Sequence, residues 1–112
     1  EALKQAIKQK NLNVVIVKGE NWHKGVLGIV ASRLVERFNK PAIVISFNKE
    51  IGIGSARSLH TIDLGHIIMY AKNEGLLVNG GGHKMAAGLK ISMKMYNHFL
   101  KFIDNIFNKN PV

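Results

Sequence analysis

Cysteine is absent from the 112-residue sequence. This absence excludes a disulfide framework, a thiol nucleophile and a thiolate metal site, and it suits a reducing compartment, so we expect a cytoplasmic protein. Proline occurs only twice, and no uninterrupted apolar run reaches the roughly 18 residues that span a membrane. Hydrophobic residues nevertheless make up 46% of the chain, which indicates a globular domain with no membrane partner.

Acidic side chains are also scarce. The chain has 7 Asp and Glu residues against 16 Lys and Arg, which gives a formal net charge of +9 at pH 7. Its two aspartates, Asp63 and Asp104, do not lie beside histidines at the spacing of metal ligands. We therefore predict neither catalytic residues nor a metal site within this chain. The surplus of positive charge favours an anionic partner such as nucleic acid.

The sequence predicts alternating helices and strands. Runs of β-branched residues predict strands, and apolar residues that recur every 3.6 positions predict helices. The predicted helices are residues 1–10, 26–38, 64–72 and a closing helix capped by Ser92, and the predicted strands are residues 14–17, 42–47, 51–55 and 87–91. The first two strands flank a helix with short connections, which indicates a right-handed crossover, and a turn makes the third strand antiparallel. We expect one α/β domain with a mixed, mostly parallel β-sheet flanked by helices.

The sharpest local feature is a run of three glycines, Gly80, Gly81 and Gly82, followed by His83. Consecutive glycines lose conformational entropy on folding and contribute no side chains to a core, so their presence requires another reason. In a turn, their unobstructed N–H groups form a concave nest for a phosphate oxygen. We predict that this turn binds an anion, with a plain tight turn as the alternative.

A second candidate lies at the end of the third predicted strand. Ser55 and Arg57 are two residues apart, so their side chains share one face of a strand, and Ser58 adds a second hydroxyl. A guanidinium beside hydroxyl groups suits the recognition of phosphate. The alternative is an arginine that contacts only solvent.

A third candidate precedes the predicted helix at residues 26–38. The stretch contains Trp22, His23 and Lys24, and the N–H groups and dipole of a helix N-terminus favour an anion. We include His23 among the predicted phosphate-binding residues. The alternatives are that His23 or Asn21 caps the helix, and that Trp22 packs as a core anchor instead of stacking on a base.

Four motifs follow one another along the chain. They are Trp22-His23-Lys24-Gly25-Val26, Pro41-Ala42-Ile43-Val44-Ile45, Gly54-Ser55-Ala56-Arg57-Ser58, and Gly80-Gly81-Gly82-His83 with Ala86-Ala87-Gly88. Together they resemble the DHHA1 domain of RecJ-type single-strand-specific exonucleases, a branch of the DHH phosphoesterase superfamily. The resemblance extends from about residue 14 to residue 107. One departure is Lys24, which stands where the family usually has proline at the first helical turn.

The resemblance implies a two-part nuclease that degrades single-stranded DNA from the 5′ end in recombination and repair. A DHH domain would hold Mn²⁺ or Mg²⁺ and hydrolyse the phosphodiester, while the DHHA1 domain closes over the DNA. We therefore interpret residues 1–12 as the end of a connecting helix from an N-terminal catalytic domain outside this chain, and residues 13–112 as the DHHA1 domain. The implied partners are single-stranded DNA and that DHH domain.

Carried onto this chain, the resemblance implies that Arg57, Ser55 and Ser58 hold phosphate. It also implies that Gly80–Gly82 and His83 line the cleft, with His23 at its border. This chain alone is expected to have no nuclease activity. Two other functions remain open: a DHHA1 domain of a phosphodiesterase that acts on short oligonucleotides or cyclic dinucleotides, and a non-catalytic module that docks to another repair protein.

Overall fold

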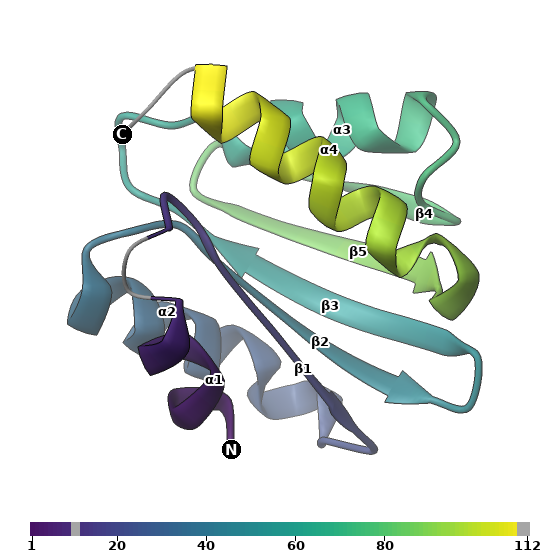
Figure 1. The fold of residues 1–112 in the computed structure, drawn as a ribbon, viewed down its shortest axis with the longest axis horizontal. Coiled ribbons are helices and arrows are strands. Elements are labelled where there is room, and N and C mark those ends of the chain that lie inside the picture. The colour runs from purple at the N-terminus through teal and green to yellow at the C-terminus, as the bar shows by residue number, and fades with distance from the viewer. Residues whose placement is uncertain (10–11, 110–112) are drawn as a thin grey trace.

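The computed structural model describes residues 1–9 and 12–109, which form four α-helices, two short 3-10 helices and five strands (Figure 1). The helices are α1 (Ala2–Lys8), η1 (Lys24–Val26), α2 (Leu27–Phe38), α3 (Leu64–Asn73), η2 (Met93–Met95) and α4 (Tyr96–Lys109). The strands are β1 (Val15–Glu20), β2 (Ala42–Asn48), β3 (Ile51–Arg57), β4 (Asn79–Gly82) and β5 (Ala86–Ser92). The four predicted helices and four predicted strands are all present, although the predicted end of the first helix falls on residues 10–11, outside the described residues.

The five strands form one mixed sheet in the order β1-β2-β3-β5-β4. β1 and β2 are parallel neighbours with α2 between them in the chain, so the predicted crossover is confirmed. The other three pairings, β2 with β3, β3 with β5 and β4 with β5, are antiparallel. The mixed α/β fold is therefore confirmed, but the expectation of a mostly parallel sheet is wrong. A short turn joins β4 to β5, and strands connected in this way run antiparallel.

The strand that the sequence did not predict is β4, which contains the glycine run. Glycine is depleted in strands, and a run of glycines has no alternation of polar and apolar side chains. In the structure Gly80 pairs with Leu89 and Gly82 pairs with Ala87 at the edge of the sheet. The prediction of a turn is therefore wrong. The expected nest does not form over these residues, because successive N–H groups along a strand point in opposite directions.

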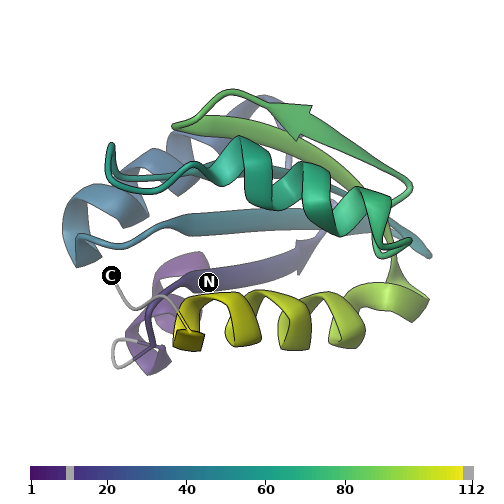
Figure 2. The ribbon, with the colours of Figure 1, turned by 90° about the horizontal axis from the view of Figure 1, so that it is seen from above.

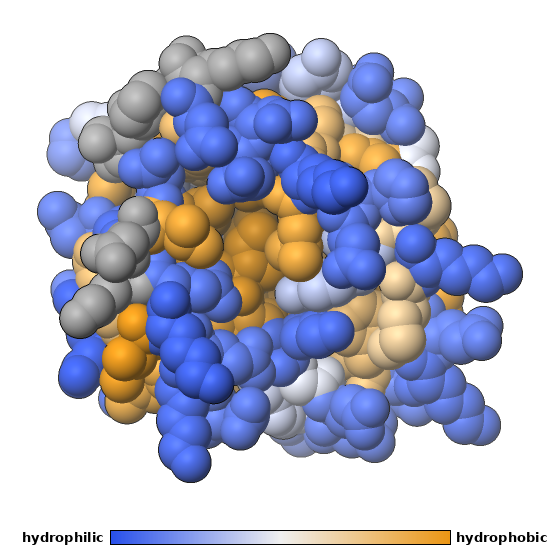
Figure 3. Space-filling model, in the orientation of Figure 1, coloured by the Kyte–Doolittle hydropathy of each residue, from blue (hydrophilic) through white to orange (hydrophobic). Residues whose placement is uncertain are grey.

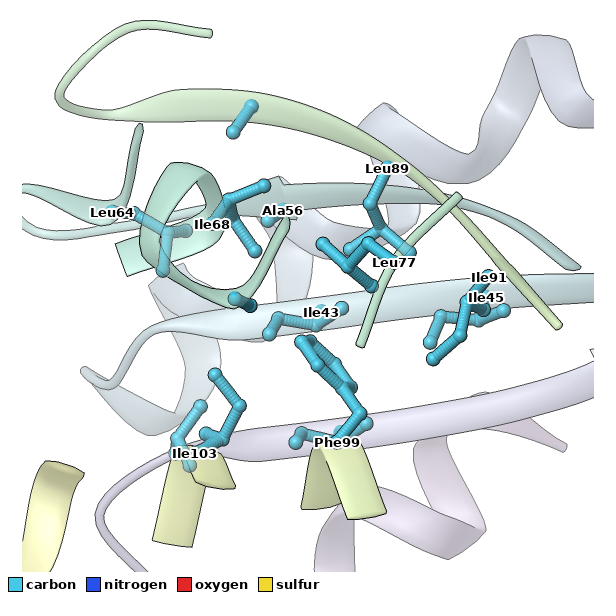
Figure 4. Close-up of a cluster of buried hydrophobic side chains, with 14 of the residues drawn as sticks. Ile43, Ile45, Ala56, Leu64, Ile68, Leu77, Leu89, Ile91, Phe99 and Ile103 are labelled. Carbon is cyan, nitrogen blue, oxygen red and sulfur yellow. The ribbon is translucent and has the colours of Figure 1, made fainter. Parts of the chain in front are cut away.

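Helices cover the sheet on both sides. Figures 1 and 2 show α3 and α4 on one face and α1 and α2 on the other. The larger core lies under α3 and α4 (Figure 4), and its fully buried side chains include Ile43, Ile45, Ile68, Phe99 and Ile103. The smaller core lies under α1 and α2, and it includes Ala6, Val15, Val17, Leu27, Ala31 and Val44. Residues of β1 and β2 alternate between the two cores, as the pleat of a strand requires.

Local hydrogen bonds fix the ends of the helices. The Asp63 carboxylate accepts from the His66 N–H at 3.1 Å and so caps α3. Asn39 ends α2 in the left-handed conformation with φ 54°, and its N–H donates to the Val35 carbonyl at 2.7 Å. The Ser92 hydroxyl accepts from the Lys94 N–H at 3.3 Å at the start of η2, which leads directly into α4.

Gln5 of α1 and Gln9, the residue that follows α1, cover the outer edge of β1. The Gln5 carboxamide donates to the Lys18 carbonyl at 2.6 Å and accepts from the Lys18 N–H at 2.9 Å. The Gln9 carboxamide makes the same pair of bonds to Ile16, at 2.7 and 2.8 Å. Four helical residues rise roughly 6 Å and two strand residues roughly 6.6 Å, so the two repeats match. Each carboxamide thus takes the place of a peptide group in a neighbouring strand.

Candidate nucleic-acid interface

One face of the sheet is only half covered. α2 packs on β2 and β3, so on the same face of β5 and β4 no helix of the described residues lies above the sheet (Figures 1 and 2). We call the uncovered surface of β3, β5 and β4 the open face. Strand pairing arranges its residues in three rows: Arg57 with Ala86 and His83, Ser55 with Gly88 and Gly81, and Ile53 with Lys90 and Asn79.

The middle of the open face consists of very small residues. Gly88 is exposed, Gly81 and Ala86 are half-buried, and none of them projects a long side chain. A Cβ atom added at Gly88 would have no neighbour closer than 3.9 Å. A hollow of about 430 Å³ lies here, lined by both strands of the β4–β5 hairpin and by Ile53. A ligand can therefore approach the backbone of the sheet closely.

Arg57 lies between β3 and the first turn of α2. A Cβ atom at Gly28 would collide with the Arg57 guanidinium, so the absent side chain at residue 28 creates the space that the guanidinium fills. Arg57 Nη1 donates to the Ala56 carbonyl at 2.9 Å. The first turn of α2 carries no acidic residue, so nothing in that turn neutralises the guanidinium. Ser55 is on the same face of β3, as strand alternation predicts, because Gly54 and Ala56 face the larger core.

Trp22 and His23 directly precede η1, which leads into α2. The His23 Nδ1 accepts from the Gly25 N–H at 3.0 Å, so His23 is the cap of η1. A neutral ring that accepts at Nδ1 carries its proton on Nε2, and the exposed side chain presents this donor to solvent. The Trp22 indole is half-buried and packs on Gly19, where a Cβ atom would collide with the ring. His23 is therefore a cap, and Trp22 is a packing residue, as the two alternatives stated.

The three glycines of β4 have different surroundings. Gly80 faces α3, where a Cβ atom would lie 2.9 Å from Ile68. At Gly82, whose φ is +154°, a Cβ atom would lie 2.6 Å from both the Ala86 carbonyl oxygen and the Ala87 Cα. Gly80 and Gly81 both line the hollow, but a Cβ atom at Gly81 would meet only the end of the Met69 side chain, at 3.6 Å. Packing therefore explains two of the glycines, and access to the open face remains for Gly81.

The turn after β4 is fixed in place by α3 and by the end of β3. A Cβ atom added at Gly65 would lie only 2.5 Å from the His83 carbonyl oxygen, so α3 and the turn approach each other closely. The Leu64 N–H donates to the Lys84 carbonyl at 2.9 Å. The Ser58 N–H donates to the Met85 carbonyl at 3.0 Å, and its hydroxyl donates to the Ile62 carbonyl at 3.2 Å. The Ser58 side chain is buried, so its hydroxyl holds this loop together and does not face the open surface.

The structure therefore brings together some, but not all, of the predicted site residues. Ser55, Arg57 and Gly81 share the open face with His83 at its end, whereas His23 caps η1. Adjacent strands are about 4.8 Å apart, so roughly 10 Å separates the β3 and β4 backbones, too far for one phosphate to contact both. Sequence reasoning did not find the role of Gly28. The available signal was a glycine in an otherwise apolar first helical turn, but the sequence did not indicate which residue of β3 would lie against it.

A second hollow lies on the opposite face of the sheet, between β1 and α4. It has a volume of about 600 Å³, and Figure 3 shows apolar side chains gathered in it. Its lining includes Leu12, Val14 and Ile16. Tyr96, in its wall, is buried, and this burial raises the pKa of the phenol above its usual value. The Lys18 ammonium lies 4.6 Å from the centre of the Tyr96 ring.

Within residues 1–9 and 12–109, no three His, Asp or Glu side chains come close enough to hold a metal ion. The described residues therefore do not fit a hydrolytic metal centre, which needs several such ligands. In the same part of the chain, every helix is too short or too polar to cross a lipid bilayer.

Comparison with known proteins gives consistent matches. The sequence model of the DHHA1 domain family matches residues 11–109. The single-stranded-DNA-specific exonuclease RecJ of Bacillus subtilis is 40% identical over 91 residues, which are 78% of this chain and 11% of that protein. RecJ of Haemophilus influenzae is 38% identical over 93 residues, 80% of this chain and 15% of that protein. The chain thus spans less than one sixth of the length of these relatives.

The fold is also similar to that of solved structures. A crystal structure of exonuclease RecJ bound to manganese matches with a TM-score of 0.83 and 27% sequence identity. The match covers 98% of this chain and 27% of the other.

Proposed function

The chain belongs to the DHHA1 domain family, and from this membership we propose that it is the substrate-binding domain of a RecJ-type 5′→3′ single-stranded-DNA exonuclease acting in DNA recombination and repair. The observation that carries the proposal is the open face, which combines an arginine, a hydroxyl and a floor of glycine and alanine on one uncovered sheet surface. Single-stranded DNA would lie on this face with its phosphates toward Arg57. A second domain of the same protein, the DHH domain, would lie across the DNA.

Each residue has a distinct part in this proposal. Arg57 supplies a permanent positive charge and a planar set of donors, which suits a phosphate group. The Ser55 hydroxyl, on the same face, donates a further hydrogen bond. His23 would offer its Nε2 proton from the start of η1, and Gly81 lets the DNA backbone approach the sheet. Ser58 has no contact with DNA in this proposal, because its hydroxyl is buried against the Ile62 carbonyl.

We assign bond cleavage to the DHH domain, where Mn²⁺ or Mg²⁺ would be held. The described residues of this chain supply no ligand cluster for such an ion. Its contribution is to bind and orient the phosphates of the strand, which lowers the entropic cost of bringing a phosphodiester to the catalytic centre. The purified 112-residue chain with Mn²⁺ is therefore expected to bind single-stranded DNA without cutting it. Metal-dependent cleavage by this chain would contradict the assignment.

The binding test uses fluorescence anisotropy with a labelled, 5′-phosphorylated oligothymidylate over a series of salt concentrations. Contacts to phosphate make the logarithm of the affinity fall linearly with the logarithm of salt, with a slope of about 0.7 per phosphate for a single strand. We expect Arg57→Ala to weaken binding and to reduce this slope by about 0.7. Arg33→Ala is the matched control, because Arg33 is exposed on α2 and its substitution removes the same charge away from the open face.

Equal losses for the two arginine variants would mean that net charge alone attracts the DNA. Binding that depends on neither salt nor Arg57 would refute the proposed interface. Loss of binding in Arg57→Ala with Arg33→Ala unchanged supports it.

A further inference from the structure

The open face continues past Ser55 into another hollow on the same face of the sheet, and none of the predicted site residues lines it. This hollow has a volume of about 480 Å³, and it lies between η1 and the far end of β3 and β5. Lys24, Trp22, Ile51, Ile53 and Lys90 are among its lining residues. Ile53 and Lys90 also line the hollow beside Gly81, so the two hollows share one wall. We call the hollow lined by Lys24 and Lys90 the lysine pocket.

The lysine pocket joins positive charge to exposed apolar surface. Lys24 and Lys90 are exposed, and neither ammonium group has an ion-pair or hydrogen-bond partner among the residues that the structure describes. Ile51 and Ile53 are each 38% exposed, which is unusual for large aliphatic residues in a sheet. An ammonium group acts as a point charge for phosphate, while apolar side chains contact the faces of bases.

No carboxylate lines this pocket in the described part of the chain. Glu20 and Glu50 lie at the same end of the sheet, since Glu20 pairs with Phe47 and Glu50 is in the β2–β3 turn, but neither side chain forms part of the lining. The two lysines are therefore not neutralised within the pocket. Its chemistry suits an anion that also carries a flat apolar group, and a nucleotide has both.

The lysine pocket is too far from Arg57 to bind the same nucleotide. Ile53 and Arg57 are four residues apart on β3, which corresponds to roughly 13 Å along the strand. Stacked nucleotides advance about 3.4 Å each along one strand, so this distance covers about four stacked nucleotides, and fewer if the DNA is extended. A strand of DNA that begins at Arg57 and follows β3 reaches the lysine pocket only after more than one nucleotide.

We propose that the lysine pocket is a second nucleotide-binding subsite, in which Lys24 and Lys90 bind phosphate while Ile51, Ile53 and the Trp22 ring contact a base. The inference rests on the proposed function, because it extends the DNA path that starts at Arg57. Its consequence is a dependence on substrate length. Oligonucleotides long enough to reach both sites bind more tightly than those that reach only Arg57.

The test compares a 5′-phosphorylated thymidine dinucleotide with the corresponding hexanucleotide, titrated into ¹⁵N-labelled protein. The chain has one tryptophan, so a single indole N–H resonance reports on the pocket. We expect this resonance and the Ile53 amide to shift with the hexanucleotide and to stay in place with the dinucleotide. For the hexanucleotide, Lys90→Ala and Lys24→Ala should each reduce the salt slope of binding by about 0.7, with no change for the dinucleotide.

Lys101→Ala is the matched control, because Lys101 is exposed on α4, which covers the opposite face of the sheet. The inference is overturned if Lys90→Ala and Lys101→Ala have equal effects on the hexanucleotide, or if the dinucleotide binds as tightly as the hexanucleotide. Failure of the underlying proposal gives a different result, in which Arg57→Ala changes the affinity of neither oligonucleotide. The experiment thus separates the two.

Discussion

The contact between Gly28 and Arg57 makes a prediction that needs no DNA. Replacing Gly28 with alanine places a methyl group where the Arg57 guanidinium lies, and the three nearest atoms to that methyl group all belong to Arg57. The end of an arginine side chain is flexible, so it moves away and the backbone does not shift. Arg57 then loses its 2.9 Å hydrogen bond to the Ala56 carbonyl.

Two opposing contributions set the size of the effect on stability. Alanine in place of glycine in a helix stabilises by about 0.5–1 kcal/mol, and less close to the helix end. A lost hydrogen bond costs about 1 kcal/mol. In the native background, Gly28→Ala should therefore change the free energy of unfolding by less than about 0.5 kcal/mol, since the two terms nearly cancel. In an Arg57→Ala background only the helix term remains, and the same substitution should stabilise by about 0.5–1 kcal/mol.

The measurement is a double-mutant cycle of urea unfolding followed by circular dichroism. We expect a coupling free energy of about 1 kcal/mol between the two positions. In the Arg57→Ala background, Gly28→Ala should also raise the melting temperature by about 2–4 °C. The same stability change in both backgrounds would show that the guanidinium does not occupy the space above Gly28. That result would remove the structural basis for Arg57 as a preorganised phosphate ligand.

Three further predictions concern stability. Gly82→Ala should destabilise by about 2 kcal/mol or more because the new Cβ meets backbone atoms at 2.6 Å, whereas Gly88→Ala should change the urea midpoint little because its Cβ enters open space. Gln9→Ala should cost about 1–3 kcal/mol, and more than Gln5→Ala, because the Gln9 bonds are partly buried and those of Gln5 are exposed; equal losses would contradict this ranking. Burial raises the pKa of Tyr96, so the unfolded chain releases the phenolic proton first, and stability should fall as the pH rises above about 10. Thermal melts of Tyr96→Phe at pH 8 and above 10 should show a smaller alkaline loss than the native chain.

The sequence determines most of the helices and strands of this fold. β2 is buried along its length from Ala42 to Phe47, and its apolar sequence, interrupted only by Ser46, made the strand easy to predict. The apolar residues that recur every 3.6 positions likewise predicted α2, which ends at Phe38 as expected. Prediction failed at β4, because a run of glycines has no side-chain pattern. Gly80 lies close to Ile68 of α3, and Gly82 lies close to Ala87 of β5. The first contact forms only once the hairpin has packed against α3, and the second only once β4 has paired with β5, so the sequence pattern did not reveal them.

The candidate site was predictable only where local geometry decides it. Strand alternation sufficed to place Ser55 and Arg57 on one face. It did not suffice for Ser58, because β3 ends at Arg57 and the chain then turns inward toward the Ile62 carbonyl. The lysine pocket was not predicted at all, since three strands, β2, β3 and β4, separate Lys24 from Lys90 in the chain and the two lysines meet only in the folded sheet.

The glutamine pairs on β1 affect where the domain can be cut. The family match begins at residue 11, after both Gln5 and Gln9. A fragment that starts there keeps the whole sheet but leaves the N–H and carbonyl groups of Ile16 and Lys18 without their carboxamide partners. An uncovered edge strand is a template for pairing with another chain. Such a fragment should self-associate at concentrations where the 112-residue chain stays monomeric, so the useful boundary for isolating this domain lies before α1.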